Sequence, residues 1–574
     1  MRKGDFTRLG VVVGGRLAGV LFFVLLSAIL SQQAALAGSA CYQHHFLGDV
    51  PNELSSDWSK EAQGLTHDAD YWYIIQNVKY ESCKCEGTIW RIPIGQDLTD
   101  DDVACDTPGV SCIGMSDDIC DQGYTHAGDP AYYAYDGVGY LLVPLEQGDP
   151  GPAIAFFRAD ASLALLGWFA LDTVNPAQNA LAWIAVDRHG VVYVGNHNAT
   201  VLLRYTVDWN RLTHGDGAIA IQFAGYVQLR DENGAPLSLE SWEQGGAFSD
   251  VAWLPFPLLY IMNGDMDASC DCGINVFEFR QSQSAEECAP EPPGCLVALR
   301  VDKSTNGYGD FSYEYHPGYN RYEEPEGLTF WNLDADGRAP GISGQLHAIM
   351  LDNEVINDNV YIKHYRLETD DVPPVITCPA PATVECTGNN GIRADDPQLA
   401  PFFGGVSATD ECDKAPVITN AAPAFFPLGS HEVGFTAKDY FQNASSCSAS
   451  VLVQDTQDPI IAVTLDRTEL WSPDHKLVTI HANVTVSDVC NPNPTFVLTS
   501  ITSNEPDNGL GDGDTANDIQ GAAYGTPDVE FALRAERSGK GAGRVYTVVY
   551  TAYDGSGNSS QAVATVVVPH DQGK

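Results

Sequence analysis

The chain has 574 residues, which is too many for one hydrophobic core and predicts two to four domains. Its 76 acidic residues against 30 basic ones give a formal net charge of −46, which excludes nucleic acid as a partner because phosphate binding needs a basic surface. The acidic residues are interspersed with aromatic and apolar runs, so the chain is expected to fold rather than to remain disordered.

Residues 1–37 have the pattern of a cleaved secretory signal. A basic start precedes a 14-residue apolar run, Leu17–Leu30, and an Ala-x-Ala cleavage pattern ends at Ala37. The run is shorter than the roughly 20 residues that a spanning helix needs. The mature chain is therefore expected to be secreted, extracellular or surface-associated, without a transmembrane segment. The alternative is a lipoprotein in which Cys41 is lipidated, although Gly38 stands where a lipobox would have Leu.

Fifteen cysteines in an exported chain predict disulfides. Ten lie between Cys41 and Cys295, four lie between Cys378 and Cys447, and Cys490 stands apart. The even local counts favour pairing within domains. The metal alternative depends on two short motifs, "CKC" and "CDC", whose spacing is narrower than that of usual zinc sites.

Residues 38–367 repeat one unit about five times, in short runs rich in Val, Ile, Tyr, Phe and Trp between Gly, Asn and Asp. The clearest unit, Ala180–Asp208, contains the hairpin turn Asp187–Gly190 between two apolar strands. Several four-stranded units of this kind predict a β-propeller, and hence an all-β fold. We expect five blades, or six if the Cys-rich stretch 99–125 contains another.

The fourth strands of the units are less regular. "IQFAGYVQL" and "FSYEYHPG" are interpreted as two of them. The segment Tyr42–Gly48 resembles Tyr313–Gly318, and the last unit lacks a fourth strand of its own. We therefore predict that the first segment of the mature chain completes the last blade and closes the ring.

A Gln or Glu stands before Gly in "QGL", "QGG" and "EGL", at Gln63, Gln244 and Glu326. Each triplet is placed where the innermost strand of a blade is predicted to begin. Glycine at that point allows backbones to approach closely near the axis. The structural interpretation is that the triplets mark blade starts, and the functional one is that Glu326 is a metal ligand.

The pattern resembles the calcium-dependent propeller superfamily of gluconolactonases, paraoxonases and strictosidine-synthase-like proteins. There a Glu-Gly pair opens an inner strand, and blades end in strands like "WRIPIG" and "LLRYTVD" here. The family holds calcium in the central tunnel with Glu, Asn and Asp from different blades. The resemblance implies candidate ligands at Glu326, Gln63, Asp129, Asn179 and Gln244. Two of these are Gln, a poorer calcium ligand than a carboxylate.

A hydrolase of this class needs a general base near the ion. His67, His126 and His347 lie near predicted strands and are candidates, but each has a structural alternative at the tunnel rim or in a packed strand. The sequence contains no G-x-S-x-G, H-E-x-x-H, P-loop or Rossmann glycine pattern. No catalytic constellation is therefore evident, which favours a protein that is not an enzyme.

After a proline-marked linker, residues 368–457 contain "PPVITCP", "FPLGSHEV" and "TAKD" followed by "VLVQD". These motifs closely resemble the hyalin repeat, an extracellular immunoglobulin-like module often found in adhesive proteins. Short alternating strands between turn signals agree with a β-sandwich. Of the three connectivities that its four cysteines allow, we expect Cys378 with Cys447 and Cys386 with Cys412.

Residues 458–574 repeat two elements of this module. "DECDKAP" returns as "DVCNPNP" and "TAKDYFQN" as "TAYDGSGN", which predicts a second Ig-like sandwich. The segment also resembles a C-terminal module common in exported bacterial proteins, with "ELWSPDHK" and "VPHDQG". Cys490 occupies the place of Cys412, but Cys386 has no counterpart, so Cys490 is predicted to be unpaired.

An acidic insertion lies between the two repeated elements, at residues 504–520. Its candidate calcium ligands are Asp507, Asp512, Asp514 and Asp518. Their spacing is not that of an EF-hand. The alternatives are a solvated acidic loop and pairing with the basic stretch Arg534–Arg544.

Two functions remain. The first is an exported adhesion-type protein whose propeller binds a glycan, a small molecule or another extracellular protein at the axis, with Glu324, Glu326, Gln63 and His126 at the rim. The second is a calcium-dependent lactonase or esterase with Glu326 as a metal ligand. Several carboxylates on the inner ring favour the enzyme, whereas Gln and Gly favour binding. The sequence leans toward binding, although fold alone does not decide function.

Overall fold

Strands make up nearly all of the regular structure, as the short apolar runs predict. The structure is a computed structural model, which divides into two compact units. Unit 1 comprises the chain up to Pro374 with two further segments, Thr409–Pro416 and Asp439–Asn443, and unit 2 comprises the remainder. The structure describes residues 41–571 except 52–53, 55, 79–86, 125, 147–150, 172–179, 196–199, 240–242, 250–256, 265–271, 282–294, 305–310, 312–322, 335–336, 354–357 and 509–514.

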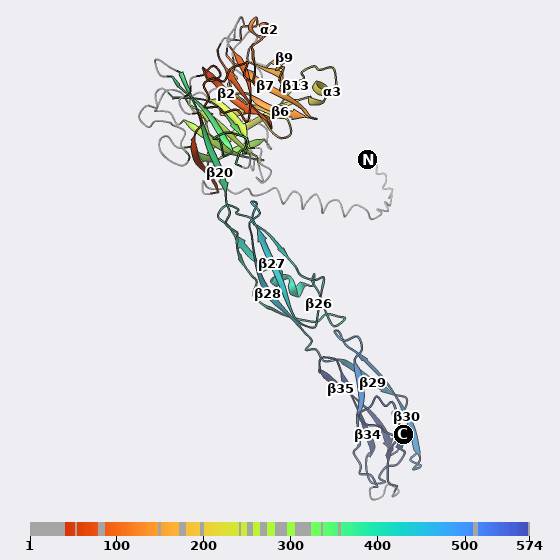
Figure 1. Cartoon of the computed structure of the whole chain (residues 1–574). Coiled ribbons are helices and arrows are strands. Elements are labelled where there is room, and N and C mark those ends of the chain that lie inside the picture. The colour runs from red at the N-terminus through yellow and green to blue at the C-terminus, as the bar shows by residue number, and fades with distance from the viewer. Residues whose placement is uncertain are drawn as a thin grey trace, which may run out of the picture. The chain divides into compact units, whose positions relative to one another are not determined.

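Unit 1 is a propeller in which the described residues form five four-stranded blades (Figure 1). In the first four blades the strands follow one another in chain order and are antiparallel. They are β2 (Ala62–His67), β3 (Tyr71–Gln76), β4 (Thr88–Pro93) and β5 (Ser111–Gly114); β6 (Ala131–Tyr135), β7 (Val138–Leu145), β8 (Ala153–Arg158) and β9 (Leu165–Ala170); β10 (Ile184–Val186), β11 (Val191–Val194), β12 (Val201–Val207) and β13 (Ile221–Arg230); β14 (Glu243–Phe248), β15 (Leu258–Asn263), β16 (Gly273–Gln281) and β17 (Leu296–Lys303).

The fifth blade combines the two ends of the propeller. Its strands β18 (Glu323–Phe330), β19 (Leu346–Asn353) and β20 (Asp358–Thr369) are completed by β1 (Tyr42–Asp49), which pairs antiparallel with β20. The predicted closure of the ring is thus confirmed. The Cys-rich stretch supplies β5, the outer strand of the first blade, and not a sixth blade.

One predicted outer strand is corrected. The fourth strand of the fourth blade is β17 and not "FSYEYHPG", most of which lies outside the described residues. Strand β17 also pairs in parallel with β13, from Val227 opposite Leu296 to Arg230 opposite Leu299. This pairing joins the third and fourth blades into one eight-stranded sheet.

Five apolar clusters hold the ring together, one between each pair of neighbouring blades. Alternate residues of one strand belong to two different clusters, because the two faces of the strand contact different blades. In β3, Trp72 and Ile74 pack toward the fifth blade, whereas Tyr73 and Ile75 pack toward the second. A strand buried on both faces needs apolar residues at every position, which explains the continuous run "YWYII".

Unit 2 contains the two predicted β-sandwiches. The first has the sheet β22-β28-β27-β25 with the pairs β21-β24 and β23-β26, and the second has the sheets β29-β30-β33-β32 and β31-β34-β35. Their strands are β21 (Val375–Thr377), β22 (Ala382–Glu385), β23 (Gly391–Arg393), β24 (Ser407–Thr409), β25 (Val417–Asn420), β26 (Phe425–Pro427), β27 (Gly429–Lys438) and β28 (Ala444–Gln454), then β29 (Ile460–Leu465), β30 (Leu477–Ser487), β31 (Thr495–Ser503), β32 (Ile519–Gln520), β33 (Glu530–Arg534), β34 (Gly543–Tyr553) and β35 (Ser559–Pro569).

The helices among the described residues are few and short. They are α2 (Asp117–Cys120), α3 (Trp209–His214), the 3-10 turn Pro397–Leu399 and α5 (Ala400–Gly404). Among the described residues, no helix is long and apolar enough to cross a membrane.

The disulfides confirm one expected pair and correct two expectations. Cys378 is bonded to Cys447, but Cys386 is bonded to Cys490, and Cys412 is bonded to Cys41 at the start of β1. Cys490 is therefore paired, contrary to the prediction. The bond to Cys412 also occupies the Cys41 sulfur, which a lipid anchor would need.

The repeated motifs "DECDKAP" and "DVCNPNP" form two equivalent turns, one around Cys412 and one around Cys490. Asp410 accepts hydrogen bonds from the backbone N–H groups of Cys412 and Asp413, and Asp488 does the same for Cys490 and Asn491. Equivalent turns hold the two cysteines, and each bonds to a cysteine from an earlier part of the chain.

Cys105–Cys112 is a further bond, and Cys120, Cys272 and Cys295 are also in disulfides. Disulfides in this number fit an extracellular protein.

Candidate functional site

The three Gln/Glu-Gly triplets lie at the propeller axis. In β2, β14 and β18 the pairing register shifts across Gln63, Gln244 and Glu326, so each of these residues is the extra residue of a β-bulge. The prediction that the triplets mark the starts of inner strands is confirmed. A bulge explains why a long side chain is followed by glycine at the same place in three blades.

The glycine of each triplet is required by close backbone contact. A Cβ atom on Gly64 would lie 2.4 Å from the Cα of Asp129, and one on Gly327 would lie 2.4 Å from the Asp129 Oδ1. A Cβ atom on Gly245 would lie 2.8 Å from the Cα of Gly327. Four blades therefore meet at the axis, around the Asp129 side chain, and leave no space for a side chain at these three glycines.

Asp129, at the start of the second blade, is fully buried and is hydrogen-bonded to each of the other four blades. Its backbone pairs with the third blade, since its N–H donates to the Ala182 carbonyl at 2.7 Å and its carbonyl accepts from the Ile184 N–H at 3.2 Å. Its carboxylate accepts three N–H groups from the first, fourth and fifth blades: Leu65 on Oδ1 at 3.0 Å, and Gly246 and Leu328 on Oδ2 at 3.0 and 3.2 Å.

These bonds bear on the predicted metal role of Asp129. Burial raises the pKa of this carboxyl, and the three N–H donors oppose the rise because they favour the charged form. Both oxygens are engaged by the backbone, so a cation would have to compete with these bonds. Asn179, the other candidate ligand from this region, lies outside the described residues.

On the side where the inner strands begin, six polar residues form a cluster that we call the acidic mouth. Its members are Glu61, Gln63, His126, Glu146, Glu324 and Glu326. Burial raises the pKa of Glu326 well above its ordinary value, and the nearby charges of Glu324, Glu146 and Glu61 raise it further. A hydrogen bond with Gln63 opposes this rise. The structure thus brings the predicted rim residues together.

His126 lies against Glu146 in this mouth, with its Nδ1 atom 3.4 Å from Glu146 Oε2. Burial lowers the pKa of His126, but Glu146, Glu324 and Glu61 outweigh it, so the net shift is upward. Sequence reasoning missed Glu61 and Glu146. A signal existed for Glu61, because it stands two residues before the bulge residue, as Glu324 does in the fifth blade.

The other two candidate bases lie elsewhere. His347 is fully buried, with Nε2 bonded to the Trp331 carbonyl and Nδ1 to His364, which fits its interpretation as a packed strand residue. His67 lies at the opposite end of the axis, in the pocket described below.

The acidic insertion of the second sandwich is engaged by arginines where the structure describes it. Asp518 pairs with Arg544 and Arg534, as the pairing alternative predicts. Asp507 accepts the Asp518 backbone N–H, and Asp512 and Asp514 lie outside the described residues.

Two other acidic groups have oxygens close enough to share a cation. Asp370 and Asp410 meet beside the Cys412 sulfur, and Asp100, Asp101 and Asp102 form an exposed run. The Cys412 sulfur is in a disulfide, so it offers no thiolate.

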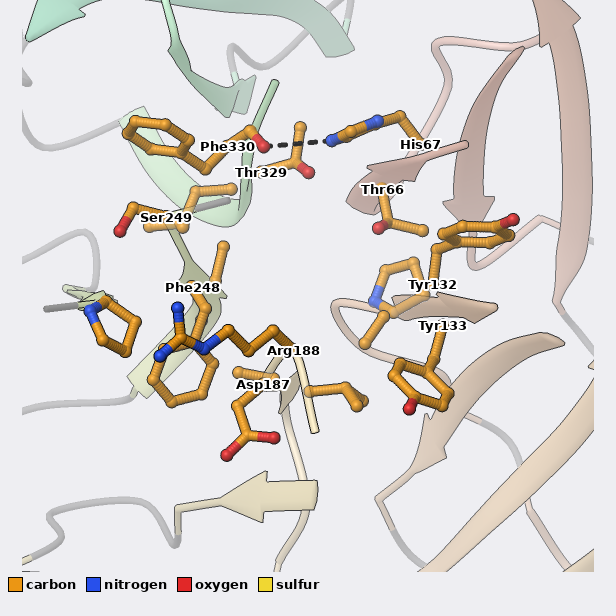
Figure 2. Close-up of a pocket in the computed structure, with 18 of the residues that line it drawn as sticks. Thr66, His67, Tyr132, Tyr133, Asp187, Arg188, Phe248, Ser249, Thr329 and Phe330 are labelled. Atoms are coloured by element: carbon orange, nitrogen blue, oxygen red, sulfur yellow. Dashed lines mark hydrogen bonds between the residues drawn. The ribbon is translucent and has the colours of Figure 1, made fainter. Parts of the chain in front are cut away.

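The end of the axis opposite the acidic mouth contains a pocket of about 510 Å³ (Figure 2). All five inner strands contribute to it, four of them through their later residues and β6 through its first four, Ala131–Ala134. Its wall combines the rings of Tyr132, Tyr133, Phe248 and Phe330 with the hydroxyl groups of Thr66, Thr329 and Ser249. We call it the hairpin-side pocket because the turns after the inner strands surround it. Sequence reasoning did not find it.

His67 forms one wall of this pocket. Its Nδ1 lies 2.9 Å from the Asp68 carbonyl oxygen and its Nε2 lies 3.0 Å from the Phe330 carbonyl oxygen. Carbonyl oxygens only accept, so both contacts are hydrogen bonds only when the ring is doubly protonated and positive. The ring also stacks on Trp331, with centroids 4.3 Å apart.

Asp187 is the one carboxylate among the described residues that line the pocket. Its Oδ1 accepts the backbone N–H groups of His189 and Val191, and its Oδ2 accepts the Tyr193 hydroxyl. These bonds fix the turn between β10 and β11. Both oxygens of Asp187 are thus engaged in hydrogen bonds that stabilise this hairpin.

No family model matches the chain. Over 101 residues, or 17% of its length, the chain is 31% identical to hyalin of Lytechinus variegatus, and the match spans 18% of hyalin. That part of the chain is hyalin-like.

Solved structures similar to the chain include a GH43_1 enzyme from Xanthomonas citri, at 12% identity over 54% of this chain and 88% of that one, with a TM-score of 0.30. An alpha-L-arabinanase of Cellvibrio cellulosa complexed with arabinohexaose matches at 12% identity over 55% and 96%, with a TM-score of 0.29. Fibronectin(III)-like modules of Clostridium thermocellum CbhA match at 13% identity over 34% and 94%, with a TM-score of 0.14. At these identities the likeness concerns the fold alone.

Proposed function

We propose that this is an exported adhesion-type protein whose propeller binds a carbohydrate in the hairpin-side pocket. The observation that carries the proposal is the composition of the wall, which combines four aromatic residues with three hydroxyl side chains. Aromatic faces pack against the C–H faces of sugar rings, and hydroxyl groups bond to sugar hydroxyls. A volume of about 510 Å³ is also in the range of ligand sites.

Binding is favoured over hydrolysis at this pocket. Glycoside hydrolysis usually needs two carboxyl groups, one on each side of the scissile bond. The described lining residues include one carboxylate, Asp187, and the turn uses both of its oxygens.

The rest of the chain supports an extracellular adhesive role. The hyalin-like stretch, the Ig-like sandwiches and the disulfides are all typical of proteins that act outside the cell. In this proposal the sandwiches carry the propeller, and the propeller supplies the specificity.

The test is binding of the mature chain to an array of oligosaccharides, followed by calorimetric titration of each hit. Tyr132→Ala should weaken binding about fivefold or more, because stacking of one ring is worth about 1 kcal/mol or more. Tyr135→Ala is the matched control, since Tyr135 lies on the same strand but does not line the pocket. Equal effects of the two substitutions, or no hit on the array, would contradict the proposal.

The acidic mouth favours a second candidate, a calcium-dependent hydrolase. Four carboxylates lie near one another around Glu326, and carboxylate oxygens are the donors that calcium prefers. A bound cation would relieve their repulsion and would polarise a lactone or ester carbonyl, and His126, beside Glu146, would be the residue that exchanges a proton.

Calorimetric titration of calcium into wild type and Glu326→Gln tests this candidate. A single site with a dissociation constant below about 10 µM, lost in the variant, supports it and would justify screening lactones and esters. Weak heats that are the same for both proteins would count against it, because they would arise from surface carboxylates.

A further inference from the structure

We propose that the ligand of the hairpin-side pocket is an anionic sugar, carrying a carboxylate or a sulfate, and that Arg188 binds the anionic group. The inference depends on the proposed carbohydrate function and narrows it to one class of ligand. Three features carry it: the fixed position of Arg188, its unused donors, and the engagement of the one lining carboxylate, Asp187, by its own hairpin.

Arg188 is the second residue of the turn between β10 and β11, and it lines the pocket. The Asp187 carboxylate fixes this turn through the N–H groups of His189 and Val191, at 2.9 and 3.0 Å. In Figure 2 the Arg188 guanidinium and the Asp187 carboxylate extend in different directions from the turn. The turn therefore holds a cation at the edge of the pocket.

Most of the donors of Arg188 are unused. Its Nε–H donates to His189 Nε2 at 3.3 Å, and among the described residues no carboxylate pairs with its guanidinium. Arginine has five N–H donors in a planar fork. Four other arginines at the surface have a carboxylate partner: Arg211 with Asp216, Arg338 with Asp70, Arg366 with Asp334 and Arg393 with Asp395. Exposed Arg467 has none among the described residues, but it lies far along the chain in the second sandwich and does not line the pocket.

The carboxylates beside the pocket are engaged by the fold. Asp187, the one carboxylate of the described lining, and Asp68, which follows the lining residue His67, each accept three hydrogen bonds within their own hairpins. Both ring nitrogens of His67 lie within hydrogen-bond distance of backbone carbonyl oxygens, so this ring is held in the wall.

These features select the ligand class. A guanidinium donates two parallel N–H bonds to two oxygens of a carboxylate or sulfate group. A neutral sugar has no such anionic group. The rings of Tyr132 and Phe248 would pack against the sugar ring itself. Carboxylated and sulfated sugars present this same chemistry.

The experiment is calorimetric titration of the mature chain with three probes: trigalacturonate, its fully methyl-esterified form, and a 6-sulfated galactose disaccharide. We expect at least one anionic probe to bind about tenfold or more tightly than the neutral ester, since a hydrogen-bonded charge is worth about 1.5 kcal/mol or more. Added salt should weaken that binding. Arg188→Gln should reduce the affinity for the anionic probe to about that for the ester.

Two controls make the result specific. Arg393→Gln removes an exposed arginine of the first sandwich and should leave all affinities unchanged. Arg188 is an exposed turn residue, so thermal unfolding will show whether its variant keeps the wild-type fold.

The outcomes separate the two proposals. Equal affinities for the ester and both anionic probes would overturn the anionic-sugar inference and leave the carbohydrate site standing, provided that Tyr132→Ala weakens them all. Preference for one anionic probe supports the inference and identifies its source as carboxylate or sulfate. If no saccharide binds, charged or neutral, the carbohydrate function itself fails and the inference fails with it.

Discussion

Buried carboxyl groups in the propeller differ in how their burial is compensated. Asp129 accepts three backbone N–H groups, which favour its charged form. Glu278, on β16, has less support. Burial raises its pKa to about 7, and the charge of Arg280 and a hydrogen bond with Tyr42 offset only part of the rise. Glu278 is therefore the clearer source of pH-dependent stability.

The sign of that dependence follows from the two protonation equilibria. Between pH 4.5 and about 7 the unfolded chain releases the Glu278 proton, whereas the folded chain keeps it. The free energy of unfolding should therefore fall as the pH rises through this window, by up to about 3 kcal/mol. Glu278→Gln should flatten the curve of melting temperature against pH, measured by calorimetry. The exposed control Glu432→Gln should not, and a slope equal to wild type in Glu278→Gln would contradict the assignment.

The sequence predicted some residues of the site and missed others for a physical reason. Glu326 and Gln63 were recognisable because each precedes a glycine at the start of an apolar run, and the bulge places both at the axis. Arg188 gave no such signal, since an arginine in a polar turn is ordinary. Its interest arises from what surrounds it, the pocket and the absence of a carboxylate partner among the described residues, which depends on blades distant in sequence.

At the scale of elements, the inner strands depend on glycine at the bulge. Gly327→Ala would place a Cβ atom 2.4 Å from Asp129 Oδ1 and 2.6 Å from the Gly64 Cα. These neighbours are held by hydrogen bonds and backbone, so they cannot move aside, and we expect a loss of about 1–3 kcal/mol or more. Calorimetry of the propeller transition measures it. The control is Gly337→Ala, where a Cβ atom would have no neighbour within 4 Å; similar melting of both variants would contradict the account of the axis.

Element prediction succeeded for central strands and was less certain for outer ones. Central strands such as β3 are buried on both faces, which leaves an unbroken apolar run. Outer strands touch a neighbour on one side only, and their pattern resembles that of a loop. "FSYEYHPG" and β17 were therefore hard to distinguish, whereas β1 was found because its sequence resembles another segment and the last blade lacked a strand.

For the whole molecule, domain types followed from composition and repeats, but cysteine pairing did not. Even counts within segments suggested local pairs, yet Cys412 bonds to Cys41 and Cys490 to Cys386. Pairing requires Cα atoms within about 7 Å, which is a property of the folded chain and not of its spacing. The repeated Asp-x-Cys turn was visible in the sequence, but the position of its partner was not.

The disulfides also determine how the protein would carry a pulling force. The covalent path from Cys41 to Cys490 runs through two disulfides and the short stretch between Cys386 and Cys412, so it bypasses the propeller. Stretched from its ends, the oxidised chain cannot lengthen between Cys41 and Cys412. Reduction should release the 371 residues that separate them, roughly 1,200 Å of extended chain. Single-molecule pulling with and without reductant measures this difference, and an equal extension in both would contradict the covalent path. Tension applied between the two ends of the chain would therefore pass through these disulfides and leave the propeller unloaded.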